Sequence, residues 1–430
     1  MKITVSRIVL LFSVLLHGIT LFWSYRFGEF YQDDSIMYLT LAQNLREFGV
    51  LSQSFYEPLV PDAQRLPGYP VFLLLCNRNP RVVVFVQHIL VFISGIFLYK
   101  TARLYRSHKV SRFAAGVFIL SPLPLLFSNF LLSEVLGLWG ICFAVWLWAK
   151  YETTTQTHYA IASAVTISIL FYVKPIVLVY IPVFILTTSG LMFYRKKNTL
   201  AMVVMLIPVF VLLPWALRYY TITEKVGLTT LVETNSYYGR LGGFSAWLSG
   251  ENHRNDAAVF VAADSVSSKF ANNKLLEKNI KTHYGSYQTQ ETELINIPVS
   301  KILGNLIIEN PFAYCVWSVE VLGQQFFGVG YETAFQISHN KLVSSLFSFM
   351  QIIISGVWLM AIAIYVKTIR TQSLLCHVII GTVILHSLAT AVGWADSRFR
   401  IPVEPLLCLL AAFNIFGGAN IFGSAYVKSI

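Results

Sequence analysis

Long apolar runs separated by short polar breaks are the dominant pattern along this chain. A transmembrane helix needs about 20 predominantly apolar residues, so most runs predict one membrane-spanning helix each. Two runs are long enough for two helices, and each has a polar break near its middle, at residues 128–134 and at Lys174-Pro175. The pattern predicts an all-α polytopic membrane protein with about ten transmembrane helices. The runs are residues 8–25, 82–99, 113–149, 159–194, 200–217, 346–366, 374–392 and 402–422.

The distribution of Lys and Arg between the runs predicts the topology. Residues 100–112, KTARLYRSHKVSR, hold five basic residues and no acidic one. Cytoplasmic loops are enriched in Lys and Arg, so this loop and the N-terminus are expected in the cytoplasm. Residues 195–198 (RKKN) and 367–372 (KTIRTQ) then also fall inside, whereas residues 26–81 lie outside. The first run is interpreted as a retained helix; a cleaved signal peptide is the alternative, but no small-x-small cleavage site follows it.

Three regions follow from this topology. Residues 1–218 are expected to form a transmembrane region whose first outer loop, residues 26–81, is catalytic. Residues 219–341 are polar and mixed in charge, and they predict a mainly α extracytoplasmic loop domain. Residues 342–430 are expected to supply the C-terminal transmembrane helices.

Composition supports the membrane interpretation and excludes one alternative. The 430 residues are 56% hydrophobic and 12% charged, whereas soluble domains carry about 25% charged residues. The net charge of +11 raises the possibility of nucleic-acid binding. We expect no nucleic-acid partner, because many basic residues lie between the apolar runs. The five cysteines have no metal-ligand spacing and are interpreted as small core residues.

Charged residues from distant parts of the chain share one predicted depth, the outer membrane surface. Two adjacent carboxylates near several cations suggest acid–base chemistry beside a phosphate. Ordinary interfacial anchors and helix caps are the alternative: Asp33 and Asp34 can cap the helix that follows them, and Arg65 can extend its head group to the interface. The residues are Asp33, Asp34, Arg65, Glu134, Lys174, Arg218, Asp396, Arg398 and Arg400.

Seven strings in this order carry a family resemblance: DDSIMYLTLAQNL, RLPGYPVFL, LLSEVLGLWG, YVKPIVLVYIP, PWALRYYTITEKVG, NPFAYCVWSVEVLGQQFF and DSRFRIPVEPLL. Together they resemble the GT-C-fold glycosyltransferases, in particular the group that uses polyprenyl-phosphate sugars. That group includes the protein O-mannosyltransferases and the lipid A aminoarabinose transferases. The acidic pair of the family is often Asp-Glu, whereas here it is Asp-Asp, so the catalytic position is uncertain by one residue.

The resemblance implies an inverting transfer of a sugar from a polyprenyl, undecaprenyl-like monophosphate to an acceptor hydroxyl. The reaction would take place at the periplasmic face of the cytoplasmic (inner) membrane. Asp33 or Asp34 would be the base. Glu134 is a candidate to bind a divalent metal ion or orient the acceptor, or it pairs with a cation. His253 is a second metal candidate, with simple solvation as the alternative. The candidates for the donor phosphate are Arg65, Lys174, Arg218, Arg398 and Arg400.

Several points stay open. The sequence does not identify the sugar, nor whether the acceptor is a lipid, a glycan or a protein. Arg400 and Glu404 are four residues apart, so a structural ion pair is also expected. A polysaccharide polymerase or ligase that uses polyprenyl-diphosphate glycans, a transporter and a membrane scaffold are the rival functions. Transporters usually place ionisable groups within their spans, unlike this chain.

Overall fold

The structure is a computed structural model that describes residues 5–56, 58–252, 256–270, 299–328, 330–390 and 397–416. Every regular element within these ranges is helical. Six of the helical segments are long and apolar enough to cross a membrane. The predicted all-α polytopic membrane class is therefore confirmed. The six are Arg7–Phe27, Pro80–Tyr105, Pro175–Tyr194, Asn198–Thr223, Lys341–Lys367 and Arg398–Phe416.

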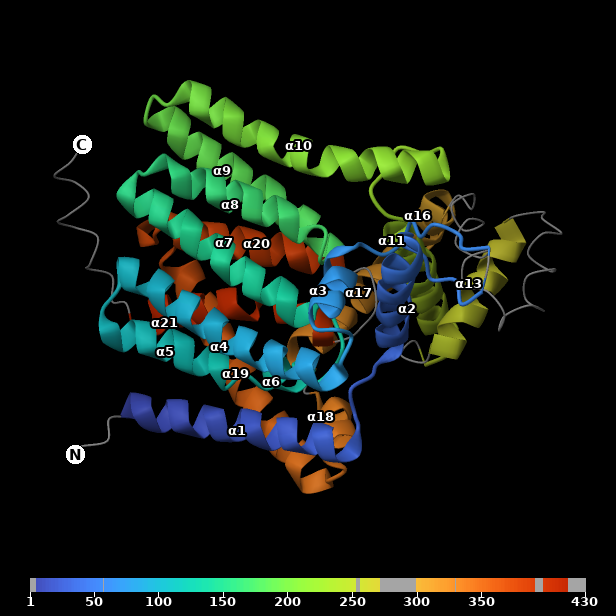
Figure 1. Cartoon of the computed structure of the whole chain (residues 1–430), viewed down its shortest axis with the longest axis horizontal. Helices are drawn as coiled ribbons and strands as arrows, with labels where there is room; N and C mark the ends of the chain where they lie inside the picture. Colours follow the sequence, from blue (N-terminus) through green and yellow to red (C-terminus); the bar gives the residue numbers. More distant parts are fainter. Residues whose placement is uncertain are drawn as a thin grey trace.

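The helices of the apolar runs lie side by side as one bundle (Figure 1). Large apolar side chains on α1, α10 and α19 point outward and are exposed, as expected for helices that face lipid. Buried residues of α7, α9, α20 and α21 form much of the core between them. The bundle helices are α1 (Val5–Phe27), α4 (Pro80–Tyr105), α5 (His108–Ile119), α7 (Glu134–Thr154), α8 (Thr157–Leu170), α9 (Tyr180–Tyr194), α10 (Asn198–Thr223), α19 (Lys341–Lys367), α20 (Leu374–Thr390) and α21 (Glu404–Phe416).

Both predicted breaks in the long runs are confirmed. The first run divides into α5, the short α6 (Pro122–Phe127) and α7, so residues 128–133 form the turn. The second run divides after α8, and the chain resumes with the short 3-10 segment η1, Pro175–Val179. Pro175 stands at the first position of η1, where its missing N–H costs no helical hydrogen bond. Lys174 is consequently placed in a turn at the end of the bundle.

The basic connections between neighbouring helices lie at one end of the bundle. The α4–α5, α7–α8 and α9–α10 connections lie at the end of the bundle where α1 begins, at the left of Figure 1. The basic segments 100–112 and 195–198 belong to this end. The helices outside the apolar runs lie at the opposite end. The connections between successive helices therefore alternate between the two ends of the bundle, in the order predicted from the sequence.

The opposite end carries two small helical layers. α2 (Asp33–Phe48) and α3 (Gly68–Leu75) come from the first loop, and the remainder comes from residues 219–341. Two compact apolar clusters hold the second layer, one around Tyr237 and Leu241 and the other around Phe244 and Trp317. Its elements are α11 (Leu231–Thr234), the π-helical η2 (Asn235–Gly242), α12 (Gly243–Leu248), α13 (Asp256–Phe270), α16 (Val299–Glu309) and α17 (Pro311–Phe327). The last helix of this region, α18 (Tyr331–Ser338), packs instead against α19 and α1 of the bundle.

The cysteines are all free, and four of them are buried. Cys315 on α17 is exposed. They behave as the small core residues expected from the sequence, apart from Cys315.

Candidate active site

Asp34 stands in the first turn of α2, directly after the turn that leaves α1. The start of α2 is held by its neighbours, because Ser35 Oγ accepts a hydrogen bond of 2.9 Å from the backbone N–H of Gln32. The carboxylate of Asp34 is directed to arginine side chains and not to the N-terminal amides of α2. Helix capping, the alternative role expected for this residue, is therefore not what its side chain does.

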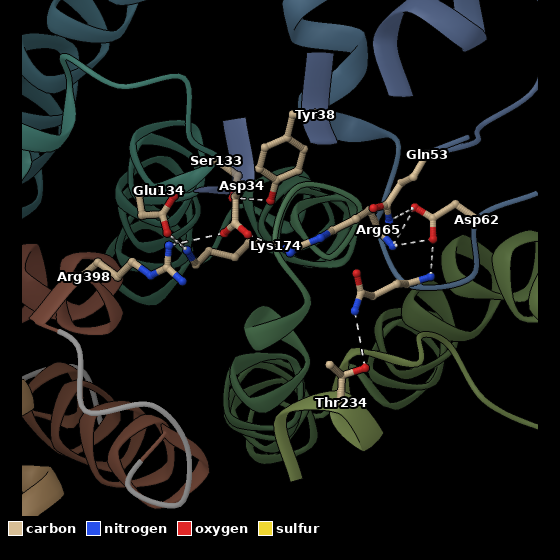
Figure 2. A network of polar contacts seen from close by, with 11 residues as sticks. Asp34, Tyr38, Gln53, Asp62, Arg65, Ser133, Glu134, Lys174, Thr234 and Arg398 are labelled. Carbon is tan, nitrogen blue, oxygen red and sulfur yellow. Dashed lines mark hydrogen bonds and ion pairs between the residues drawn. The ribbon is translucent and has the colours of Figure 1, made fainter. Parts of the chain in front are cut away.

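Two arginines hold Asp34 from different parts of the chain (Figure 2). Nη2 of Arg65 lies 2.8 Å from one carboxylate oxygen, and Nη1 of Arg398 lies 3.3 Å from the other. Arg65 belongs to the loop before α3, and Arg398 belongs to the 3-10 segment η5, Ser397–Val403. The three side chains are 14–23% exposed. Ion pairs in such a partly dry site are stronger than those at a surface.

The cations determine the charge of Asp34. Burial alone would raise the pKa of this carboxyl, but Arg65, Arg398 and Lys174 outweigh it and hold the pKa below its ordinary value of 3.8. Asp34 is consequently ionised at neutral pH.

Glu134 and Lys174 form a second ion pair beside the first. Glu134 is the first residue of α7, and Lys174 precedes Pro175 in the turn after α8. Nζ of Lys174 lies 2.8 Å from Oε1 of Glu134, with only 10% and 5% of the two side chains exposed. Of the alternatives weighed for Glu134, pairing with a cation is the one the geometry supports. Lys174 also lies next to Asp34 (Figure 2), so both pairs belong to one cluster.

A buried aspartate that sequence analysis missed shapes the loop of Arg65. The carboxylate of Asp62 accepts hydrogen bonds from the backbone N–H groups of Gln64 (2.7 Å) and Arg65 (3.3 Å), and from Nε2 of Gln53 (2.8 Å). Burial raises the pKa of Asp62, despite these hydrogen bonds. The signal in the sequence is an Asp two and three residues before the bonded N–H groups, a spacing typical of turns.

Gly68 brings this loop against the turn of Lys174. Its N–H donates a hydrogen bond of 2.8 Å to the backbone oxygen of Tyr172. A Cβ at residue 68 would lie only 2.6 Å from that oxygen. The close backbone approach therefore requires glycine, and it couples the positions of Arg65 and Lys174.

Tyr38 is a further residue at the cluster that the sequence did not single out. It lies one helical turn after Asp34, and its ring is 5.6 Å from the guanidinium carbon of Arg65. Its hydroxyl lies 3.3 Å from Oγ of Ser133, the residue before Glu134. Burial raises the pKa of Tyr38, so the phenol stays neutral. The i, i+4 spacing from Asp34 was the available signal.

Arg218 and Arg400, two residues predicted to bind the donor phosphate, have contacts away from the Asp34 carboxylate. Nη1 of Arg218 donates a 2.8 Å hydrogen bond to the backbone oxygen of Asp62, and its guanidinium lies 4.5 Å from the Trp215 ring. Arg218 therefore supports the first outer loop from α10. It contributes no bond to the Asp34 carboxylate.

Arg400 is completely buried, two residues beyond Arg398. Its Nε lies 3.0 Å from Oε1 of Glu404, which confirms the expected structural pair. Its Nη1 donates to the backbone oxygens of Gln325, at 2.9 Å, and of Phe326. Arg400 thereby links α17 to α21, and its guanidinium bonds Glu404 and backbone oxygens at the end of α17, not Asp34.

Some predicted residues lie outside the described part of the chain. These are His253, Asp396 and the side chain of Asp33. Within the described ranges, no three His, Cys, Asp or Glu side chains come together as a possible metal site. The pairing of Glu134 with Lys174 leaves the expected metal role of that carboxylate without support.

Comparison with known proteins identifies the enzyme class. Residues 70–215 match the family described as dolichyl-phosphate-mannose-protein mannosyltransferase. The matched range includes Glu134 and Lys174. It confirms the predicted resemblance to membrane glycosyltransferases of the GT-C group and the prediction that the chain is a transferase enzyme.

Two solved structures are similar to this chain at low sequence identity. Among solved structures, ArnT from Cupriavidus metallidurans bound to undecaprenyl phosphate gives a TM-score of 0.40 at 11% identity, covering 94% of this chain and 77% of that chain. The same protein in the apo state gives 0.37 at 12% identity, covering 93% and 77%. The comparison with curated proteins gives no match.

Proposed function

We propose that this glycosyltransferase moves a sugar from a polyprenyl monophosphate to an acceptor hydroxyl, with inversion at the anomeric carbon. The observation that supports this most directly is the cluster of Asp34 with Arg65, Arg398 and Lys174 at one end of an apolar bundle. A carboxylate base and several cations at a membrane surface suit a donor whose lipid tail lies in the bilayer and whose phosphate lies at the interface.

Asp34 is the proposed general base. Its lowered pKa keeps the carboxylate ionised, so it can accept the proton of an acceptor hydroxyl. The oxygen of that hydroxyl attacks the anomeric carbon while the bond from carbon to the phosphate oxygen breaks. The products are the glycosylated acceptor and polyprenyl phosphate. General-base assistance of this kind contributes roughly 10² to 10⁴ in rate.

Arg65, Arg398 and Lys174 are the proposed ligands of the donor phosphate. Each is already within the electrostatic field of Asp34, and Nε of Arg65 is buried without a hydrogen-bond partner among the residues that the structure describes. A phosphate can share these donors with Asp34, and it develops further charge as the bond to the sugar breaks. Preorganised cations at such a position stabilise the transition state.

We further propose that the site faces the periplasm or exterior and that the N-terminus is cytoplasmic. The basic connections of the bundle lie at the end opposite the cluster (Figure 1), which fits the enrichment of Lys and Arg in cytoplasmic loops. In this arrangement residues 1–218 and 342–430 form the membrane region, and residues 219–341 form the outer domain that selects the acceptor.

The test is sugar transfer from a panel of synthetic polyprenyl-phosphate sugars. The wild type is compared with Asp34→Asn and with Asp33→Asn, a matched change one residue away. Asp34→Asn should reduce kcat by about 10² or more while folding is retained. Transfer that survives in Asp34→Asn would remove the base assignment, and a folded wild type that consumes no donor would overturn the function.

A further inference from the structure

The short segment η5 carries Arg398 into the cluster around Asp34. Arg398 is the second residue of this segment, and 23% of its side chain is exposed. A long, partly exposed side chain loses conformational freedom when it is held in one orientation. The pairing of Arg398 with Asp34 therefore depends on how firmly the adjacent backbone is fixed.

His386 holds the backbone next to Arg398. Its Nε2 lies 2.6 Å from the backbone oxygen of Phe399, and its side chain is fully buried in α20. A carbonyl oxygen can only accept, so Nε2 must carry the proton. In a neutral imidazole, Nδ1 is then the acceptor, and the hydroxyl of Tyr180 lies 2.6 Å from it as the donor.

The contacts of His386 join three separate elements of the chain. Tyr180 belongs to α9, His386 to α20 and Phe399 to η5. Both ring nitrogens have partners, so the tautomer and the ring orientation are defined together. Neither Tyr180 nor His386 has a bond to Asp34. His386 also lies within electrostatic range of Lys174, but its hydrogen bond to the Phe399 carbonyl is the contact that links it to η5, the segment that carries Arg398.

The residue after Phe399 is anchored as well. Arg400 binds Glu404 and the backbone oxygens at the end of α17. Oγ of Ser121 lies 2.6 Å from the second carboxylate oxygen of Glu404. The backbone on the C-terminal side of Arg398 is consequently held at two successive residues, and Arg398 is the side chain of this segment that reaches the site.

We propose that His386 is a positioning residue that fixes the Phe399 carbonyl and thereby directs Arg398 to Asp34 and the donor phosphate, a role that rests on the transferase function proposed above. A buried histidine that merely stabilised the bundle would affect the fold without a specific link to Arg398. The two roles differ in whether the effect of changing His386 depends on Arg398.

A double-mutant cycle on ligand binding distinguishes the positioning role of His386 from a purely structural one. The affinity for a polyprenyl monophosphate is measured in nanodiscs for wild type, His386→Phe, Arg398→Ala and the double variant, because binding stays measurable when turnover is lost. His386→Phe should weaken binding by about tenfold, the effect of about one lost hydrogen bond. In the Arg398→Ala background it should weaken binding less than about twofold, because coupled residues are not additive.

Two controls complete the experiment. His386→Gln keeps one donor and one acceptor and should restore most of the affinity. His377→Phe removes the Tyr365–His377 hydrogen bond of 2.7 Å in the same helix α20, and it should leave binding unchanged.

Equal losses in both Arg398 backgrounds, or an equal loss in His377→Phe, would overturn the positioning role. Melting temperatures of all variants show which of them are folded. A folded wild type that does not bind the lipid phosphate at all would overturn the proposed function itself, and the role of His386 with it.

Discussion

At the scale of single residues, two carboxylates whose pKa values shift in opposite directions make the pH dependence testable. The pKa of Asp34 lies below 3.8 because cations outweigh burial, whereas burial raises that of Asp62. Asp34 should therefore remain a competent base at every pH above about 5. We expect no acid limb from Asp34 in a profile of kcat/KM measured from about pH 5 to pH 8. A limb in this range that persists in Asp62→Asn would contradict the assignment of Asp34.

The same shift has a consequence for stability. A carboxyl whose pKa is depressed in the folded state contributes stability above its unfolded pKa and loses it as the pH falls through the folded value. For Asp34 this window lies below 3.8. Stability measured by urea unfolding in detergent should therefore show a smaller loss below about pH 4 in Asp34→Asn than in wild type. Parallel curves for the two proteins would argue against the ion pairs.

The Glu134–Lys174 pair predicts a non-additive effect on stability. Both side chains are nearly buried, so removing one partner leaves an uncompensated charge, which typically costs about 3–5 kcal/mol. Glu134→Gln and Lys174→Met should each lower the melting temperature strongly. The double variant should regain most of the loss, although its transfer activity stays low. A double variant as unstable as the sum of both changes would contradict this interpretation.

The residues of the site differ in how well the sequence predicted them. Asp34, Arg65, Lys174 and Arg398 were among the candidates because they lie at the ends of apolar runs. Arg400 was grouped with Arg398 because both were predicted to lie at the outer membrane surface. In the 3-10 segment η5, the side chains of Arg398 and Arg400 have different surroundings. This difference cannot be predicted from the string RFR alone.

At the scale of elements, the contact between the first outer loop and the α8–η1 turn makes a prediction. A Cβ at residue 68 would meet a backbone oxygen at 2.6 Å, and backbone atoms cannot rotate away as a flexible side chain can. Gly68→Ala should therefore cost about 1–3 kcal/mol. Because the contact couples Arg65 to Lys174, transfer activity should fall too. Melting temperature and initial rate are the measurements.

Gly190→Ala is the matched control for this change. Gly190 lies in α9 with no neighbouring atom within 4 Å of the new Cβ. Alanine in a helix interior is favoured over glycine by roughly 0.5–1 kcal/mol, so this variant should be at least as stable as wild type and fully active. A Gly68→Ala protein that behaves like Gly190→Ala would show that the close approach is not needed.

The helices and their breaks were largely predictable, because about 20 apolar residues and a Lys-Pro turn are local signals. Long-range contacts were not. The buried pairing of Arg400 with the end of α17, and of His386 with Phe399, depends on how separate helices pack. No local pattern encodes such a pairing, so the support of the site became visible only in the fold.

At the scale of the whole molecule, the separation of charge between the two ends of the bundle predicts its orientation. Glu251 follows α12 and is exposed, and Gln156 is exposed between α7 and α8. The segment with Glu251 leads to α13, at the right of Figure 1, whereas the α7–α8 connection with Gln156 lies at the opposite, left end of the bundle. In a Cys315→Ala background, Glu251→Cys and Gln156→Cys each add one exposed thiol, since the other cysteines are buried.

A membrane-impermeant maleimide then reports the orientation. Because Lys and Arg are enriched in cytoplasmic loops, the thiol of Glu251→Cys should react in intact spheroplasts, and that of Gln156→Cys only after lysis. Cys315→Ala alone should remain unlabelled, which controls for the buried cysteines. The reverse pattern would place the cluster around Asp34 in the cytoplasm. The donor would then have to be presented on the inner leaflet, and the proposed periplasmic reaction would be wrong even if the transferase chemistry were right.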